Sequence, residues 1–261
     1  MKISFIQHAI IWAEPKRNLA HLTETMTAVP EDSDLIVLPE MFATGFAVQP
    51  EGVAEDEAGA TLTWMQRMAA ARHCAIAGSV AVVTGNKQFR NRFFFVKPDG
   101  STTYYDKHHL FTYGGEHERY TAGQERVVVE WRGVRFLLQV CYDLRFPLWG
   151  RNREDYDCAL YVASWPTPRI EAWTALLRAR AIENQCYVVG INRIGSDPHC
   201  DYCGASVILD PYGRALTEGP LNEECVATAE IDLAKLHAFR EKFPVLKDRD
   251  GFELRNNGIS D

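Results

Sequence analysis

Short apolar runs and amphipathic stretches alternate along the first part of the chain. Residues 2–8 (KISFIQH) and 34–40 (DLIVLPE) are compact apolar runs typical of strands, whereas residues 16–28 and 60–72 place apolar side chains at helical spacing. This order predicts strand–helix–strand units, in which helices cover one face of a sheet.

From residue 74 onward, apolar runs follow one another with short connections. They predict strands at residues 74–83, 91–98, 102–106, 126–131, 135–140, 158–166, 186–194, 205–209 and 225–231. Turn residues at Pro98-Asp99-Gly100 and at Arg132-Gly133 indicate hairpins between neighbouring strands. We therefore expect most of this region to form paired sheet strands.

Two further helices are predicted in the second half of the chain. The strongest pattern covers residues 168–184, and its apolar face carries Trp173, Leu176, Leu177, Ala181 and Ile182. A shorter helix is expected at 232–242. Helices before and after the strands predict an α/β fold, a four-layer α-β-β-α sandwich. Because no linker-like tract interrupts the pattern, we expect a single domain over residues 1–261.

The composition is that of an ordinary globular protein. Hydrophobic residues make up 46% and charged residues 24% of the 261 positions, which argues against a disordered, fibrous or membrane-spanning chain. The net charge of -7, without a basic stripe among aromatic residues, argues against a nucleic-acid partner. Gln7, His8 and Glu14 interrupt the N-terminal apolar stretch before a signal sequence is complete, so we expect a cytoplasmic protein without a membrane partner.

The chain contains seven cysteines, an odd number without the spacing of a disulfide framework. Cys200 and Cys203 in the segment HCDYC, with His199 beside them, are the one closely spaced pair. A zinc site needs a second ligand pair, and the sequence offers none. We therefore favour packing roles for these cysteines, and keep a metal or redox site as the alternative.

Three polar residues follow directly on predicted strands. Glu40 comes after DLIVLP, Lys107 after TTYYD and Cys141 after RFLLQV. Each has an ordinary interpretation as a solvated carboxylate, a surface ammonium or an inert buried thiol. Ligand sites of layered α/β proteins, however, collect beyond strand ends, so we expect the three side chains to converge. Together they would supply a nucleophile, a base and a stabilising positive charge.

Three segments that contain these residues, LIVLPEMFATGF, YDKHHLF and VCYDLRFP, resemble the catalytic signatures of the nitrilase superfamily of carbon–nitrogen hydrolases. The resemblance continues through YVASWP, LLRARAIENQCYVVGINRIG, SVILDPYGRAL and REKFPVLKDRD, and so spans nearly the whole chain. The segments NRF and EHERYTAG are similar to those of bacterial omega-amidases within this superfamily. The resemblance implies the four-layer nitrilase-like sandwich.

The resemblance also implies a role for each polar residue. Glu40 is expected to be the general base, Lys107 the electrostatic stabiliser and Cys141 the nucleophile. Glu116 in GGEHERY is expected to orient Lys107 and assist proton transfer, although Glu118 lies two residues further on. The implied reaction is acyl transfer through a cysteine thioester, without a cofactor or a metal.

The implied substrates are terminal amides of small 2-oxo dicarboxylic acids, chiefly 2-oxoglutaramate and 2-oxosuccinamate. An N-carbamoyl amino acid hydrolase or a true nitrilase remains a related alternative. A thiol-based metal-binding or redox-sensor protein that uses Cys200 and Cys203 is an alternative of another class, as is a non-catalytic interaction module. The presence of Glu40, Lys107 and Cys141 argues against the last.

Several residues are candidates for substrate binding. The backbone N–H of Tyr142 follows the nucleophile and is expected to stabilise the oxyanion. Arg145 either pairs with Asp143 within the turn or binds the substrate carboxylate in bidentate geometry. Phe42 and Trp165 lie at element ends, where they are expected to wall a small pocket. The other tryptophans considered, which lie within strand or helix patterns, are expected to pack in the core: Trp12, Trp64 and Trp173.

A homodimer is the expected assembly. In the helix at 168–184, Arg178, Arg180 and Glu183 alternate in a way that suits a subunit contact, and proteins that this chain resembles commonly pair through this region. The charged C-terminal tail, about residues 244–261, fits either a loosely held terminus or an arm at a dimer interface.

Overall fold

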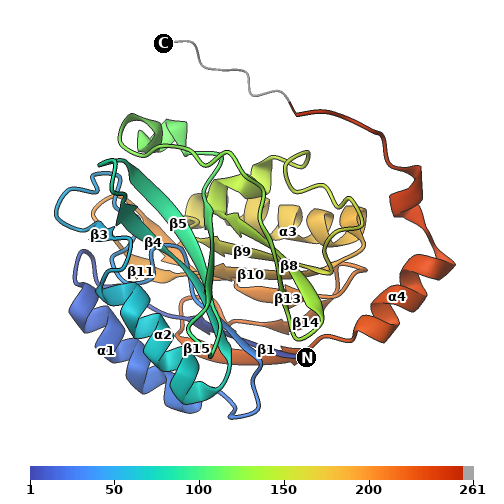
Figure 1. Ribbon diagram of the computed structural model, residues 1–261, viewed down its shortest axis with the longest axis horizontal. Helices are drawn as coiled ribbons and strands as arrows, with labels where there is room; N and C mark the ends of the chain where they lie inside the picture. The colour runs from blue at the N-terminus through green and yellow to red at the C-terminus, as the bar shows by residue number, and fades with distance from the viewer. Residues whose placement is uncertain (255–261) are drawn as a thin grey trace.

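Two β-sheets stack face to face in the computed structural model, which describes residues 1–254 (Figure 1). The first sheet comprises β1 (Lys2–Gln7), β2 (Leu35–Val37), β3 (Glu55–Asp56), β4 (Ala75–Val83), β5 (Phe89–Val96), β6 (Thr102–Asp106) and β15 (Cys225–Glu230). The second comprises β7 (Val128–Trp131), β8 (Val134–Val140), β9 (Cys158–Ala163), β10 (Tyr187–Asn192), β13 (Val207–Leu209) and β14 (Ala215–Glu218). A separate hairpin is formed by β11 (Ile194–Ser196) and β12 (Asp201–Cys203). The helices are α1 (Pro15–Thr25), α2 (Ala60–Arg72), α3 (Ile170–Asn184) and α4 (Leu233–Lys242).

The strand order explains where the polar residues gather. The first sheet has the order β15-β1-β2-β4-β5-β6, with β3 beside β4, and the second has the order β14-β13-β10-β9-β8-β7. In each sheet three central strands run parallel: β1, β2 and β4 in the first, and β8, β9 and β10 in the second. Parallel strands end at the same edge, so the residues that follow them are brought together.

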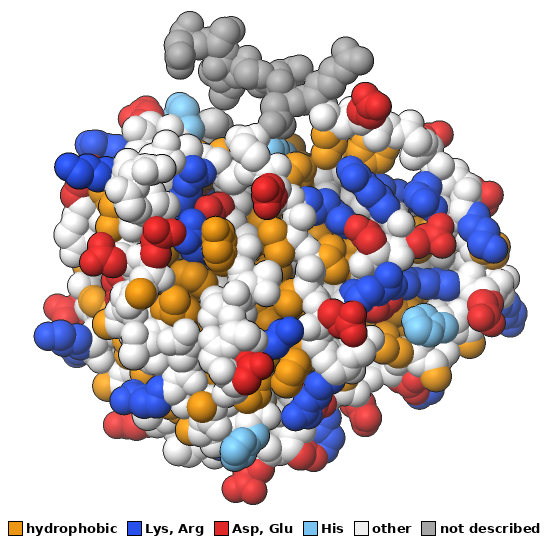
Figure 2. Space-filling view, in the orientation of Figure 1, with side chains coloured by type: hydrophobic (Ala, Val, Ile, Leu, Met, Phe, Trp, Pro, Cys, Tyr) orange, Lys and Arg blue, Asp and Glu red, His pale blue; other side chains and the backbone are white. Residues whose placement is uncertain are grey.

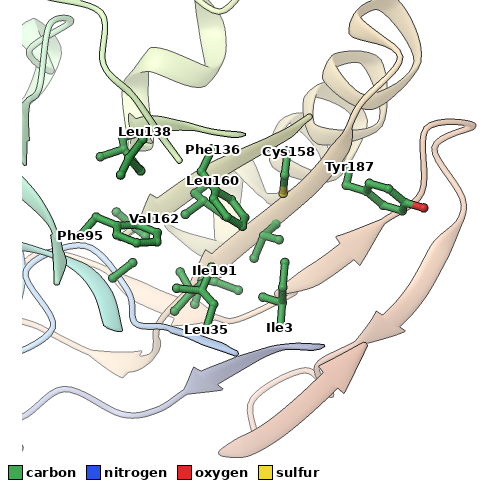
Figure 3. Close-up of a cluster of buried hydrophobic side chains, with 14 of the residues drawn as sticks. Ile3, Leu35, Phe95, Phe136, Leu138, Cys158, Leu160, Val162, Tyr187 and Ile191 are labelled. Atoms are coloured by element: carbon green, nitrogen blue, oxygen red, sulfur yellow. The ribbon is translucent and has the colours of Figure 1, made fainter. Parts of the chain in front are cut away.

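The largest cluster of buried apolar side chains fills the space between the two sheets. Ile3 and Leu35 of the first sheet face Leu160 and Ile191 of the second (Figure 3). Side chains alternate along a strand, so β1 sends Ile3 into this cluster and Ile6 toward the helices on its other face. Burial on both faces is why these strands appear in the sequence as nearly continuous apolar runs.

Helices cover the two outer faces (Figure 1). Leu22 of α1 and Trp64 of α2 pack on the first sheet, whereas Trp173 and Leu177 of α3 pack on the second. The predicted four-layer α-β-β-α sandwich is therefore confirmed. Trp64 and Trp173 are core residues, as the sequence predicts.

Two side chains of α3 depart from the prediction. Ile182 is 54% exposed and does not belong to the buried face. Arg180 is buried, because its guanidinium donates to the Leu144 carbonyl at 2.6 Å and to Glu183 Oε1 at 2.8 Å. The prediction that Arg180 contacts another subunit is therefore wrong, since its hydrogen bonds bind it within its own chain.

The surface and the C-terminal segment add two observations. Acidic and basic side chains are interspersed on the face shown in Figure 2. Within the predicted tail, Leu246 is buried and Arg249 pairs with Glu154 at 2.6 Å, so this part packs against its own chain. The remaining tail residues, 255–261, lie outside the described residues. Residues 1–254 contain no helix that is both long enough and apolar enough to cross a membrane.

Candidate active site

Glu40, Lys107 and Cys141 all line one cavity, and Lys107 is the centre of its polar cluster. Lys107 Nζ lies 2.9 Å from Glu40 Oε1 and 2.9 Å from Glu116 Oε2. All three of these charged side chains are fully buried. Glu40 follows β2, Lys107 follows β6 and Cys141 follows β8, so the cluster joins strand ends of both sheets.

The Glu40 carboxylate is held by hydrogen bonds to both of its oxygens. Besides Lys107, Asn91 Nδ2 donates to Oε1 at 2.8 Å, and the backbone N–H of Ser164 donates to Oε2 at 2.8 Å. Asn91 Nδ2 also lies 3.2 Å from Glu116 Oε1, so one amide bridges both acids. Neither Asn91 nor Ser164 is predicted from the sequence to lie at the site.

Cys141 lies where β8 ends and the chain turns sharply. Its backbone φ is +45°, a left-handed conformation that costs a β-carbon-bearing residue about 1–3 kcal/mol. Asp143 holds this turn, since Oδ2 accepts from the Val140 N–H at 2.9 Å and from the Tyr105 hydroxyl at 2.8 Å. Its Oδ1 accepts from the His109 N–H at 3.0 Å. The strand therefore stops here to present the thiol in a fixed, strained turn.

These bonds decide between the two interpretations of Arg145. Asp143 is occupied by Val140, Tyr105 and His109 rather than by Arg145. Among residues 1–254, the Arg145 guanidinium has no hydrogen bond or ion pair, and its Cζ lies 4.9 Å from the Trp165 ring centroid at the cavity. The interpretation as a charged pair within the turn is therefore wrong.

The ionisation of the cluster follows from its burial. Burial raises the pKa of the Cys141 thiol, and the negative charge of Glu40 raises it further, to well above its ordinary value. Burial alone would lower the pKa of Lys107, but the charges of Glu116 and Glu40 outweigh it and raise that pKa well above its ordinary value. At neutral pH the site thus holds a neutral thiol beside a charged ammonium, so the thiol needs a base in contact with it.

The cavity measures about 630 Å³, within the range of small-molecule sites. Trp165 and Tyr142 form part of its wall, as predicted for the pocket. Phe42 does not: its ring packs 5.9 Å from that of Trp64 in the core beneath α2, and the prediction that it lines the pocket is wrong. Phe46 lines the cavity instead, with its ring centroid 5.2 Å from Lys107 Nζ.

Two further parts of the cavity wall come from segments predicted to pack in the core. Trp12 lies in the loop after β1, not in a strand, and lines the cavity with its ring edge-on to His199 at 6.4 Å. His199 and Cys200 line the cavity from the loop between β11 and β12, whereas Cys203 is buried. Over residues 1–254, no group of three or more His, Cys, Asp or Glu side chains is arranged to hold a metal ion. The metal-binding alternative therefore lacks a ligand set in the described part of the chain.

A four-layer sandwich with a buried Glu–Lys–Cys cluster at its strand ends is the architecture of a nitrilase-type enzyme. The sequence profile of the carbon-nitrogen hydrolase family matches residues 2–241, and the chain belongs to this family. It is an enzyme that hydrolyses carbon–nitrogen bonds other than peptide bonds.

Individual relatives cover the chain almost completely. It is 46% identical over 257 residues to omega-amidase YafV of Escherichia coli strain K12. The aligned region covers 97% of this chain and 98% of the relative. It is 36% identical over 250 residues to the 2-oxoglutaramate amidase of Bacillus subtilis strain 168, with 94% and 96% covered. A crystal structure from Xanthomonas campestris, a CN-hydrolase superfamily protein with an arsenic adduct in its active site, superimposes with a TM-score of 0.94 at 42% identity. That match covers 98% of this chain and 99% of the other.

Proposed function

We propose that this enzyme is an omega-amidase that releases ammonia from the terminal amide of small 2-oxo dicarboxylic acid monoamides, chiefly 2-oxoglutaramate and 2-oxosuccinamate. The observation that carries the proposal is one cavity with two chemically distinct parts. Cys141 lies at the Glu40–Lys107 cluster, and the unpaired guanidinium of Arg145 lines the same cavity. The names of the two relatives described above support this substrate class.

In the first half-reaction, Glu40 takes the proton of the Cys141 thiol while Sγ attacks the amide carbonyl. The tetrahedral oxyanion that forms is stabilised by the Lys107 ammonium and by the backbone N–H of Tyr142. Tyr142 lies in the first turn of a short helix, Cys141–Arg145, where N–H groups lack intrahelical acceptors. When the intermediate collapses, the C–N bond breaks and the nitrogen takes the proton from Glu40 and leaves as ammonia.

In the second half-reaction, Glu40 deprotonates a water molecule, which attacks the thioester. The C–S bond then breaks, the acid product is released and the thiolate recovers its proton from Glu40. Glu116 keeps Lys107 charged and in place through its 2.9 Å contact. One base therefore serves both half-reactions.

The far end of the substrate carries a carboxylate, and Arg145 is the proposed partner for it. A guanidinium matches a carboxylate in bidentate geometry, and this one has no other acid among the described residues. The guanidinium lies over the Trp165 ring, with Cζ 4.9 Å from the ring centroid.

The test is a substrate panel scored by ammonia release: omega-amides of 2-oxo acids, N-carbamoyl amino acids and nitriles. We expect the omega-amides to have the highest kcat/KM. Intact-mass and peptide analysis during turnover of a slow omega-amide should place a transient acyl group on Cys141 among the seven cysteines. Turnover of only the carbamoyl compounds or nitriles, or an acyl group on Cys200, would refute the proposal.

We further propose a homodimer, formed through an apolar patch of Ile182, Tyr212 and Phe243. These side chains are 54%, 52% and 59% exposed, and the Tyr212 ring packs 4.2 Å from that of Phe239 in α4. Light scattering should report twice the 29.6 kDa chain mass, and Ile182→Glu should shift it to the monomer. A wild-type monomer at micromolar concentration would contradict this assembly.

The free cysteines support the proposed cytoplasmic location, where thiols stay reduced.

A further inference from the structure

A second arginine, Arg169, lines the cavity that contains Cys141 and Arg145. It lies immediately before α3, and its Cζ is 5.4 Å from the Phe111 ring centroid. Within residues 1–254 its guanidinium forms no hydrogen bond or ion pair. The pKa of Cys200, raised mainly by burial, is partly lowered again by the charge of Arg169, which places this charge near the β11–β12 loop. The cavity therefore holds two guanidinium groups without partners.

Trp165 connects the two arginines. Its ring lies under Arg145, and its Nε1–H donates to the Arg169 carbonyl at 2.8 Å. Its own backbone is held on both sides by Asn192, which accepts from the Trp165 N–H at 2.7 Å and donates to the Trp165 carbonyl at 2.9 Å. Trp165 thus holds the Arg145 guanidinium directly and the Arg169 backbone, while the Arg169 guanidinium lies over the Phe111 ring. Groups that are pre-arranged in this way lose little freedom on binding.

Both acids that line the cavity, Asp197 and Glu40, already have hydrogen-bond or ion-pair partners. Asp197 Oδ2 accepts from the Tyr202 hydroxyl at 2.6 Å, and Oδ1 accepts from the N–H groups of His199 and Cys200 at 2.8 Å. The other acid of the wall, Glu40, is bound to Lys107. Two unpaired positive charges in a partly buried cavity are costly, so a ligand with several anionic or carbonyl oxygens fits there.

We propose that Arg169 and Arg145 form a two-guanidinium clamp that binds the 2-oxo-carboxylate end of the substrate. One guanidinium binds the carboxylate in bidentate geometry, and the other bridges a carboxylate oxygen and the neighbouring 2-oxo oxygen. This inference rests on the proposed function and deepens it, since it states how the site selects 2-oxo acids.

The clamp also gives a physical reason to discriminate against glutamine. Glutamine carries the same terminal amide and carboxylate, but an ammonium replaces the 2-oxo group. That ammonium would face two guanidinium groups, and like charges repel one another strongly in a low-dielectric site. The 2-oxo oxygen instead accepts a hydrogen bond. Arg169 is therefore expected to determine specificity as well as affinity.

The test compares kcat/KM for three amides of equal chain length: 2-oxoglutaramate, glutaramate and valeramide. Glutaramate lacks the 2-oxo group, and valeramide lacks both the 2-oxo group and the carboxylate. Arg169→Gln should lower kcat/KM for 2-oxoglutaramate at least about tenfold more than for valeramide, with glutaramate in between. Arg169→Lys, which keeps the positive charge but not the bidentate guanidinium geometry, should recover part of the loss. Arg67→Gln, an exposed arginine on α2, is the matched control.

Equal losses for all three amides would indicate a structural role and overturn the clamp, as would no loss at all. A second readout does not depend on turnover. In the Cys141→Ala background, calorimetry should show that Arg169→Gln weakens 2-oxoglutarate binding at least about tenfold and glutarate binding by less. If the wild type hydrolyses valeramide but neither acidic amide, the proposed function fails. The calorimetry then still decides whether the clamp exists.

Discussion

The backbone N–H of Ser164 donates to Glu40 Oε2 at 2.8 Å, and this contact crosses from one sheet to the other. Glu40 follows β2 of the first sheet, whereas Ser164 follows β9 of the second. The position of the proposed base therefore depends on how the two sheets stack. Trp165, the next residue along the chain, lines the cavity, and the Arg145 guanidinium lies over its ring. The end of β9 therefore positions both the proposed base, Glu40, and the proposed carboxylate-binding residue, Arg145.

Asn91 should act as a positioning residue for the acids. Its amide donates to Glu40 at 2.8 Å and to Glu116 at 3.2 Å, so Asn91→Ala removes a side chain that bridges two mutually repelling carboxylates, as Lys107 does. We expect kcat to fall roughly 100-fold, with a smaller change in KM. The acid limb of the pH–rate profile should move to higher pH, because a donor that favours the charged carboxylates is lost.

The pH profile separates positioning from stability. A variant that only destabilised the fold would lose active protein without moving the acid limb, and that result would contradict the assignment. Asn91→Asp should be worse than Asn91→Ala, because it adds a third buried carboxylate to a cluster with one ammonium. Steady-state kinetics over a pH series, with circular dichroism to confirm folding, provides both readouts.

Arg145→Lys should raise KM for 2-oxoglutaramate more than it lowers kcat. Lysine keeps the positive charge but cannot bind a carboxylate in bidentate geometry or stack on Trp165 in the same plane. The contact is made in both the ground state and the transition state, so its loss appears mainly in KM, by roughly 10-fold. The reverse pattern, with kcat reduced at constant KM, would indicate that Arg145 supports the turn of Cys141 instead.

The Cys141 thiol should remain protonated at neutral pH. Burial and the charge of Glu40 raise its pKa well above the ordinary value of 9.0. The difference in thiolate absorbance between wild type and Cys141→Ser should therefore stay flat through neutral pH and rise only above pH 9.0. A thiolate signal already present at neutral pH would mean an ion pair with Lys107, and Glu40 would then have no proton to take from the thiol.

The sequence located the site residues whose side chains act from the ends of strands. Glu40, Lys107 and Cys141 stand out because apolar runs locate the strand ends. β6 is antiparallel to β5, which is antiparallel to β4, so β6 ends at the same edge of the first sheet as β2. Ser164 acts through its backbone N–H, which no residue identity reveals. Asn91 lies within β5, where a polar residue usually indicates only an exposed face.

Loop residues explain most of the errors. Phe42 and Phe46 are both aromatic residues in the loop after β2, and without a periodic backbone nothing indicates which one faces the cavity. Trp12 lies in the loop after β1 and outside the strand predicted at residues 2–8, so the prediction that it belongs to a strand or helix and packs in the core is wrong. The β11–β12 hairpin has only three residues in each strand, too few for alternation to appear. Arg180 is buried because a backbone carbonyl of another element accepts its hydrogen bond, a partner the sequence cannot show.

His8 should make the protein less stable as the pH falls below neutral. Its side chain is fully buried, and burial lowers its pKa from 6.5 to about 3. The folded chain therefore keeps His8 neutral while the unfolded chain protonates near pH 6.5. Since the unfolded state binds more protons between these values, the free energy of unfolding contributed by His8 decreases as the pH falls through this window, by about 1.4 kcal/mol per pH unit.

His8→Gln removes the titration of His8 and leaves every other titratable group in place, so the difference between the variant and the wild type isolates His8. Between about pH 7 and pH 5, the free energy of unfolding of the wild type should fall roughly 2 kcal/mol more than that of the variant. Urea unfolding at the two pH values measures both differences. His8 Nδ1 lies 3.1 Å from the Ala9 carbonyl, and Nε2 has no partner among residues 1–254, so no described group favours the protonated ring strongly enough to offset burial. Parallel losses in the two proteins would show that His8 is protonated in the folded state, and the buried environment assigned to it would be wrong.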